Sequence, residues 1–243
     1  MIFEDIGKFS LFLFEVLFSK FKLKHFFRDF FNYIILSTPL VIISTMSVGA
    51  VLALEGYITL KPFGATDYIS AGVTLSLFRE LGAVMVNFLL TARSVSALAS
   101  KIATLKVTER LDALEMLAIN PVSFLATPAV YAFILGSLLL TIIGNTFGIL
   151  GSILTCKYVF FLNSEVQYKY IYQVVNYKDL IHGLIKSLFF GLFISAFACY
   201  FGFKSDFGSE GVGKAVTKAV TYSTIFILIS DYFLTNILHS LGL

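Results

Sequence analysis

Charge is scarce in this sequence. Only 14% of the 243 residues are Asp, Glu, Lys or Arg, whereas 58% are hydrophobic. An average soluble domain is about 25% charged and about 45–50% apolar. The chain therefore lacks the polar side chains that would cover a water-soluble globule, and it is too hydrophobic to be disordered. The composition predicts an integral membrane protein in a single domain, residues 1–243.

Metal-binding and nucleophilic residues are also scarce. Cys156 and Cys199 form no CxxC motif, and His25, His182 and His239 are scattered, so no disulfide framework and no metal site is predicted. The net charge of +3 is too small to indicate a nucleic-acid partner. The sequence has no GxSxG motif, no HExxH motif and no recognisable pair of catalytic acids. We therefore expect no catalytic residues.

Five apolar stretches have the length of a transmembrane helix, which needs about 20 residues. They are 30–54, 68–92, a span within the uncharged run 116–156 that begins between Pro121 and Pro128, 183–203 and 215–238. No internal repeat is visible among them, so the inverted-repeat design of many secondary transporters is not indicated.

Positive charge is unevenly distributed over the segments that connect these stretches. One set of flanks holds Lys8, Lys20, Lys22, Lys24, Arg28, Lys101, Lys106, Arg110, Lys204, Lys214 and Lys218, and the opposite set holds only Lys61, Lys157, Lys169 and Lys178. The positive-inside rule then places the N-terminus in the cytoplasm and the C-terminus on the far side. The bias towards Lys and Phe suggests an A+T-rich genome. We expect a bacterial inner membrane, or a plastid envelope if the chain is encoded by an organelle.

The N-terminal segment 1–28 has an amphipathic pattern. At about 100° per residue, five of its polar residues fall within an arc of roughly 60°: Glu4, Lys8, Glu15, Ser19 and Lys22. The rest of the segment is rich in Phe and Leu. This pattern predicts a helix that lies in the cytoplasmic interface of the membrane. The alternative is an irregular start to the first span. A signal peptide is excluded because Glu15 interrupts the apolar part and no small-residue cleavage site follows.

Two motifs of small residues occur within the spans. Ala92, Ser96 and Ser100 recur every four residues, and Gly144 and Gly148 form a GxxxG motif. Small residues at this spacing let two helices approach closely. A separate Gly-rich stretch, 208–215, resembles the phosphate-binding GxxxxGK[ST] loop but ends in alanine, where that loop has serine or threonine. We expect no cofactor to be bound by this chain.

Several charged residues lie inside or beside the apolar stretches, where charge is costly unless it faces protein or water. The candidates for a structural network or a polar substrate path are Arg79, Glu80, Arg93, Lys101, Lys186 and Asp231. The adjacent pair Arg79–Glu80 either forms ion pairs with neighbouring spans or has a functional role. Lys186 and Asp231 lie in different spans and either pair with each other or line a hydrated cavity. A further alternative is that Lys186 extends its ammonium group to the membrane interface.

Between the second and third spans, residues 104–119 predict a short amphipathic helix on the cytoplasmic side. Its apolar positions recur at helical spacing, and Asn120–Pro121 is expected to end it, because a residue before proline disfavours the helical conformation. Such a helix is either an inert connector or the site where a permease engages a cytoplasmic motor. The candidate coupling residues are Lys106, Val107, Thr108, Glu109, Arg110, Asp112 and Leu114.

These motifs together resemble the MlaE/YrbE permease family. The resemblance is carried by Arg79-Glu80-Leu81-Gly82, Lys106-Val107-Thr108-Glu109, Asp112-Ala113-Leu114, Asn120-Pro121, Gly211-Val212-Gly213-Lys214-Ala215 and Ser230-Asp231-Tyr232-Phe233-Leu234-Thr235. They occur in order along nearly the whole chain. Two positions depart from the family pattern: Ala83 replaces a usual proline, and Lys101 replaces a usual acidic residue.

The resemblance implies the membrane subunit of an ABC transporter that moves phospholipid or a related hydrophobic molecule. It implies an interfacial N-terminal helix, five spans and a homodimer. A separate ATPase subunit would use ATP and Mg and dock on the coupling helix, and an MCE-domain protein would bind on the far side. From the residues alone, an integral-membrane lipid-modifying enzyme and an ion-coupled secondary transporter that uses Lys186 and Asp231 stay open as alternatives.

Overall fold

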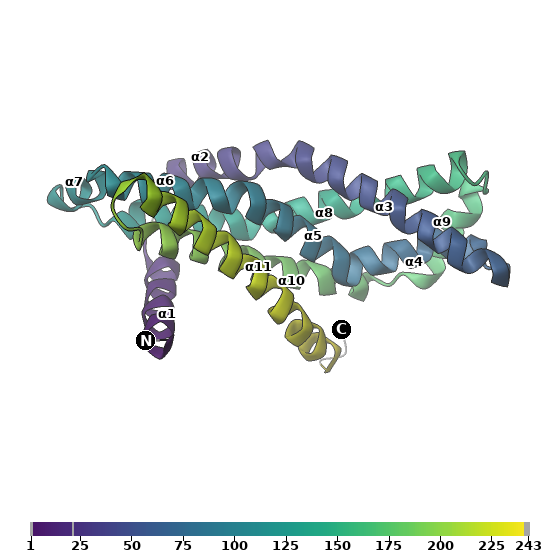
Figure 1. The fold of residues 1–243 in the computed structure, drawn as a ribbon. Helices are drawn as coiled ribbons and strands as arrows, with labels where there is room; N and C mark the ends of the chain where they lie inside the picture. Colours follow the sequence, from purple (N-terminus) through teal and green to yellow (C-terminus); the bar gives the residue numbers. More distant parts are fainter. Residues whose placement is uncertain (1, 21, 241–243) are drawn as a thin grey trace. The chain divides into compact units, whose positions relative to one another are not determined.

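The computed structural model describes residues 2–20 and 22–240 (Figure 1). Within these ranges every regular element is helical, and five helical segments are long and apolar enough to cross a membrane. They are Leu23–Phe63, Thr66–Val107, Val122–Tyr158, Tyr177–Phe203 and Gly208–Ser240. The all-α membrane fold predicted from the sequence is confirmed. The helices extend past the uncharged stretches because backbone hydrogen bonding continues into the charged flanks.

The chain packs as two compact units, each assembled from separate stretches of sequence. The first unit consists of the described residues up to Ser37, Asn87–Ser137 and Leu188–Leu228, and the second consists of Thr38–Val86, Leu138–Ser187 and the described residues from Ile229 onward. The last three long helices, α8 (Thr127–Tyr158), α10 (Tyr177–Phe203) and α11 (Gly208–Ser240), contribute to both units.

The first unit begins with two helices in place of the single segment expected over 1–28. Helix α1 is Ile2–Phe18 and α2 is Leu23–Tyr33. The α1 helix packs on α10 through aromatic rings, with Phe9 stacked on Phe197 at 4.6 Å between ring centroids. The Tyr131 hydroxyl of α8 donates a hydrogen bond to the Leu17 carbonyl oxygen (2.9 Å). These contacts anchor the N-terminal helix to the rest of its unit.

The remaining elements of the first unit are short. They are the last residues of α5 (Gly82–Leu90), η1 (Ile35–Ser37), η5 (Thr91–Val95), α6 (Ser96–Val107), α7 (Arg110–Met116) and η6 (Val122–Ala126). In Figure 1, α7 follows directly from the end of α6. The predicted helix 104–119 is divided here, because α6 continues to Val107 and the chain then turns at Glu109.

The Asn120–Pro121 pair plays a different part from the one predicted. We expected it to end the amphipathic helix, but α7 already ends at Met116, and Ala118 has a left-handed backbone (φ 58°). The Asn120 Oδ1 atom accepts hydrogen bonds from the backbone amides of Val122 (2.8 Å) and Ser123 (3.3 Å). Asn120 therefore caps the start of the third span, and Pro121 occupies a first-turn position where its missing N–H costs nothing.

The second unit is held together by a close helix crossing. It contains α3 (Thr38–Leu60), η2 (Lys61–Phe63), η3 (Thr66–Tyr68), α4 (Ile69–Ser76), η4 (Leu77–Leu81) and the first residues of α5 (Gly82–Leu90). A Cβ atom at Gly49 of α3 would overlap the Gly148 carbonyl oxygen of α8, so no side chain fits there. The prediction that the GxxxG motif marks a helix contact is confirmed.

One helix of the second unit was not predicted. Helix α9 (Ser164–Val174) follows α8 and packs beside α4, as Figure 1 shows. The Ser70 amide donates to Gln167 Oε1 (3.1 Å), and Gln167 Nε2 donates to the Thr66 carbonyl oxygen (3.2 Å). The amide side chain of Gln167 is fully buried and satisfied at both ends. The sequence did not indicate α9, because this segment lies between two spans and contains no apolar run.

The Gly-rich stretch that resembles a phosphate-binding loop is helical. Gly208 has a positive φ of 86° and begins α11, and the stretch forms the first turns of that helix. A phosphate-binding loop needs consecutive non-helical amides that point at the ligand. The structure thus gives a physical reason, besides the missing hydroxyl, why this stretch does not form such a loop.

Candidate functional site

The charged residues of the second span lie on π-helical turns. Arg79 and Glu80 belong to η4, and Arg93 belongs to η5; each of these elements is a five-residue π-helix. A π-turn inserts an extra residue into the helix and rotates the side chains that follow it, and such turns are frequent at functional sites. The charged residues are therefore not placed as an ideal 3.6-residue repeat would place them.

In the second unit, charges from three helices converge. We define the charged cluster as Glu80, Lys186, Asp231 and Thr235. The Lys186 ammonium group is fully buried and donates to Glu80 Oε2, to Asp231 Oδ1 (3.0 Å) and to Thr235 Oγ1 (2.7 Å). The Thr235 hydroxyl also lies 3.1 Å from Glu80 Oε1. All three protons of the ammonium group thus have an acceptor, which is the condition for keeping a charge inside a membrane protein.

The structure pairs Lys186 with Asp231 and adds Glu80 to the pair. The cluster contains two carboxylates and one ammonium group. The acidic side chains are not fully enclosed, since the side chain of Glu80 is 35% exposed and that of Asp231 is 24% exposed. The cluster therefore has a closed cationic centre and an open anionic side.

Arg79 makes a second set of contacts in the same unit. Its Nε atom donates to Asp179 Oδ1 (2.6 Å), and Asp179 Oδ2 accepts from the Asn176 amide (2.8 Å) at the start of α10. The Nδ1 atom of His182 lies 3.1 Å from the Arg79 carbonyl oxygen, which can only accept, so this ring nitrogen carries the proton. The guanidinium side chain is still 54% exposed. The adjacent charges Arg79 and Glu80 thus both bind α10, through different partners.

Arg93 and Lys101 belong to the first unit. The Arg93 Nη1 atom donates to Ser37 Oγ (2.6 Å), and the Ser37 hydroxyl lies 2.9 Å from Ser94 Oγ. Lys101 Nζ pairs with Asp29 Oδ1 (3.3 Å), and the Asp29 side chain is 1% exposed. Lys101 therefore has a structural partner in α2. The six charged residues predicted as one candidate set are divided between the two units.

The predicted coupling residues lie around α7. Lys106 Nζ donates to the Phe203 carbonyl oxygen at the end of α10 (2.8 Å). Glu109 has a left-handed backbone (φ 56°) that turns the chain from α6 into α7. Residues 108–110 and 112 are exposed, and Leu111 is buried beneath the helix. The short helix is thus fixed by one apolar residue and presents its charges outward.

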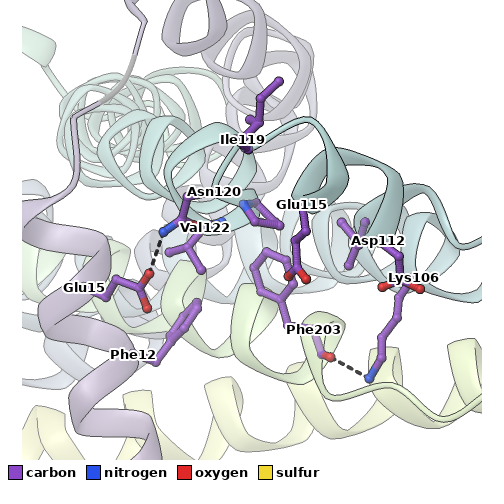
Figure 2. A pocket seen from close by; sticks show the side chains of 12 residues that line it. Phe12, Glu15, Lys106, Asp112, Glu115, Ile119, Asn120, Val122 and Phe203 are labelled. Carbon is purple, nitrogen blue, oxygen red and sulfur yellow. Dashed lines mark hydrogen bonds between the residues drawn. The ribbon is translucent and has the colours of Figure 1, made fainter.

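A cavity of about 620 Å³ lies beside α7, and we call it the α7 pocket (Figure 2). It is lined by Phe12, Glu15, Lys106, Leu111, Asp112, Glu115, Ala118, Ile119, Asn120, Pro121, Val122 and Phe203. Figure 2 shows the two hydrogen bonds that cross its wall, from Asn120 Nδ2 to Glu15 Oε1 (3.0 Å) and from Lys106 to Phe203. The pocket joins α1, α7 and the end of α10, and its carboxylates outnumber its one lysine.

Two large apolar side chains are exposed at the end of α7. Met116 is 89% exposed and Leu117 is 71% exposed. They follow the exposed acidic residues Glu109, Asp112 and Glu115. Exposed apolar residues with charges around them are typical of a surface that binds another protein. This surface contains most of the candidate coupling residues, of which Leu114 is half-buried and Val107 ends α6.

Sequence reasoning missed several partners of the predicted site residues. Asp179, His182 and Thr235 complete the polar contacts in the second unit, and Asp29 completes the Lys101 pair in the first. Asp29 and Asp179 lie at the edges of apolar stretches, where a carboxylate is ordinary. The sequence does indicate Thr235 as a partner, because it lies four residues after Asp231 and hence on the same helix face.

These features define a class of protein: a multi-pass helical membrane protein with satisfied charges inside its spans and an exposed short helix between the second and third. The family described as Permease MlaE matches residues 26–237. The chain therefore belongs to the MlaE permease family. It is a transport component, the permease of an ABC transporter, and not an enzyme.

Individual relatives agree with this assignment. A probable ABC transporter permease protein of Rickettsia typhi is 38% identical over 239 residues, which cover 97% of this chain and 92% of the relative. The intermembrane phospholipid transport system permease protein MlaE of Haemophilus influenzae is 33% identical over 153 residues, or 61% of this chain and 59% of the relative. The chloroplastic protein TRIGALACTOSYLDIACYLGLYCEROL 1 of Arabidopsis thaliana is 28% identical over 151 residues, 62% and 43% of the two chains.

Proposed function

We propose that this permease moves phospholipid through the membrane as part of an ABC transporter, and that the charged cluster lines its polar path. The observation that carries the proposal is the partial exposure of the two carboxylates of the cluster, with the Glu80 side chain 35% and the Asp231 side chain 24% exposed. The neighbouring Arg79 side chain is 54% exposed. Charges at such depth face protein or water, because lipid tails solvate them poorly. The named function of the Haemophilus influenzae relative supports phospholipid as the cargo.

The predicted orientation indicates the side of the membrane to which this path opens. Asp231 lies nine residues before the end of α11 and Lys186 lies nine residues after the start of α10. At about 1.5 Å per residue, both are roughly 14 Å from the helix ends on the far side. We infer a hydrated cavity that opens to that side, closed by a second copy of this chain in a homodimer. An MCE-domain protein would then exchange lipid with the cavity.

We propose that the energy comes from a separate ATPase subunit that docks on α7. The ATPase would bind ATP and Mg, so this chain needs no cofactor of its own. The exposed Met116 and Leu117 and the acidic residues before them form a mixed apolar and charged surface suited to a protein partner. Movement of α7 would be transmitted to α10 through the Lys106–Phe203 hydrogen bond and to α1 through the α7 pocket. The membrane would be the bacterial inner membrane.

The test is ATP-driven transfer of a fluorescent phospholipid in proteoliposomes that contain the permease and its ATPase. Glu80→Gln and Asp231→Asn remove the open anionic side of the cluster and should reduce transfer at least about tenfold. Glu165→Gln, which changes an exposed acid of α9 outside the cluster, is the matched control. Equal transfer by all three variants would contradict the assignment of the path.

A further inference from the structure

A second cavity lies in the first unit, at the end of the chain's spans that is predicted to be cytoplasmic. We call it the aromatic cavity. Its volume is about 710 Å³, and it shares no residue with the charged cluster. It is formed by the C-terminal part of α10, the connection 204–206 and the N-terminal half of α11, with one residue of α1 added. Its size is within the range of about 300–1,000 Å³ that is usual for small-molecule sites.

Aromatic rings form the deep wall of this cavity. Phe193 and Phe226 stack at 4.4 Å between centroids, Phe201 lies 4.9 Å from Tyr222, and Phe9 of α1 stacks on Phe197. The wall therefore combines rings from three helices. Apart from its tyrosine hydroxyls, such a surface is apolar, and it fits a hydrocarbon chain better than it fits a polar solute.

The rim of the cavity is cationic. Lys204, Lys214 and Lys218 line it, together with a single acid, Asp206. Lys214 is paired with Glu210 (2.7 Å), but both side chains are mostly exposed, 60% and 81%. A pair this exposed contributes little stability, so Lys214 can exchange its partner for another anion at small cost. The rim thus carries an excess of positive charge at the end of the spans that is predicted to be cytoplasmic.

Two hydroxyl groups in the cavity wall add a polar feature between the rings and the rim. Ser205 is 6% exposed, and neither its Oγ atom nor the buried Tyr200 hydroxyl has a hydrogen-bond partner among the described residues. Both residues line the cavity. Buried hydroxyls in folded proteins are almost always hydrogen-bonded. Both oxygen atoms are closed to solvent, so an acceptor in the cavity would reach them only after these side chains rotate. Phosphate oxygens are such acceptors.

We propose that the aromatic cavity binds an anionic lipid of the cytoplasmic leaflet. An acyl chain would lie along the aromatic wall, and the phosphate would contact the lysine rim and accept hydrogen bonds from Ser205 and Tyr200. The α1 helix closes one side of the site through Phe9, so bound lipid would hold α1 against α10. This inference goes beyond the transport function, because it concerns a different set of residues and does not require that the bound lipid is cargo.

The experiment is native mass spectrometry of the purified full-length permease with added phosphatidylglycerol, phosphatidylcholine or inorganic phosphate. Wild-type protein should retain phosphatidylglycerol in preference to phosphatidylcholine. The triple variant Lys204→Gln, Lys214→Gln, Lys218→Gln should bind phosphatidylglycerol at least about tenfold more weakly, since juxtamembrane lysines attract anionic lipid. The matched control is Lys20→Gln, Lys22→Gln, Lys24→Gln, which removes the same charge from exposed positions outside the cavity.

Ser205→Ala provides a milder variant that removes one hydroxyl and no charge, and it should lower the retention of phosphatidylglycerol by a few-fold. Equal retention by the rim variant and the control would overturn the proposal. Equal retention of the two lipids by wild-type protein would overturn the anionic preference. Competition by inorganic phosphate as effective as that by lipid would identify a soluble-anion site instead. None of these results depends on phospholipid transfer, which is measured separately with the ATPase present.

Discussion

The charged cluster and the α7 surface contain the same kinds of side chain in opposite environments. Lys186 is fully buried, and its three protons are accepted by groups from two other helices. Glu109, Asp112 and Glu115 are exposed, and α7 is fixed mainly by one buried leucine. Buried charge is costly to leave unpaired, whereas exposed charge contributes little to folding. The cluster is therefore expected to affect stability and transport together, and the α7 surface only partner binding.

The largest effect on stability is expected for Lys186→Met. This change leaves the carboxylates of Glu80 and Asp231 without their cation, and breaking a buried pair in this way costs about 3–5 kcal/mol. The two buried cysteines, Cys156 and Cys199, allow thermal unfolding in detergent to be followed with a thiol-reactive dye. The exposed Lys169→Met is the control and should unfold at the wild-type temperature.

A triple variant sharpens this prediction. Glu80→Gln, Lys186→Met and Asp231→Asn together remove the charges at once, so most of the lost stability should return although transfer stays low. If Lys186→Met alone unfolds at the wild-type temperature, the cluster does not hold the second unit together and the contrast with α7 disappears.

The next effect is expected for Gly49→Ala. A Cβ atom there overlaps the Gly148 carbonyl oxygen, which is backbone and cannot rotate away, so α3 and α8 must separate. Forcing extra volume into a packed contact costs about 1–3 kcal/mol. Gly72→Ala is the matched control, because nothing lies within 4 Å of a Cβ atom at that position. Equal unfolding temperatures for the two variants would show that the crossing tolerates separation.

A smaller effect is expected for Asp179→Ala. The carboxylate accepts the Asn176 amide at the start of α10 and also pairs with the half-exposed Arg79. Loss of a helix cap costs about 0.5–2 kcal/mol, and the exposed part of the ion pair adds little. Asp179→Asn keeps an acceptor for the amide and should retain more of the stability than Asp179→Ala. The measurement is the same thermal unfolding, and the reverse order would show that the ion pair matters more than the cap.

Features whose residues differ clearly from the neighbouring sequence could be predicted from the sequence alone. Lys186 and Asp231 stand out inside apolar stretches, and Gly144 with Gly148 stands out by spacing, so the charged residues and the helix crossing could be predicted. Asp29 and Asp179 could not be identified as partners, because carboxylates are common at the edges of spans. The π-turns at Arg79 and Arg93 have no pattern in the sequence, yet they set which way these side chains point. The aromatic cavity was hidden because phenylalanine is abundant throughout the chain.

The smallest effect on stability, and the largest on partner binding, is expected on the α7 surface. Glu109→Lys with Asp112→Lys reverses two exposed charges, and exposed substitutions of this kind change stability by no more than about 0.5 kcal/mol. Lysine at position 109 must still adopt the left-handed backbone that Glu109 shows, so Asp112→Lys alone is the cleaner second variant. The double variant and Asp112→Lys alone should both unfold like wild type. Their co-purification with the ATPase should fall at least about tenfold, because charge complementarity at an interface is reversed.

The control for these α7 variants is Lys169→Glu, which reverses an exposed charge on α9 and should leave co-purification intact. If the α7 variants retain the ATPase fully, the exposed short helix is a connector, and the motor must engage another surface on the cytoplasmic side.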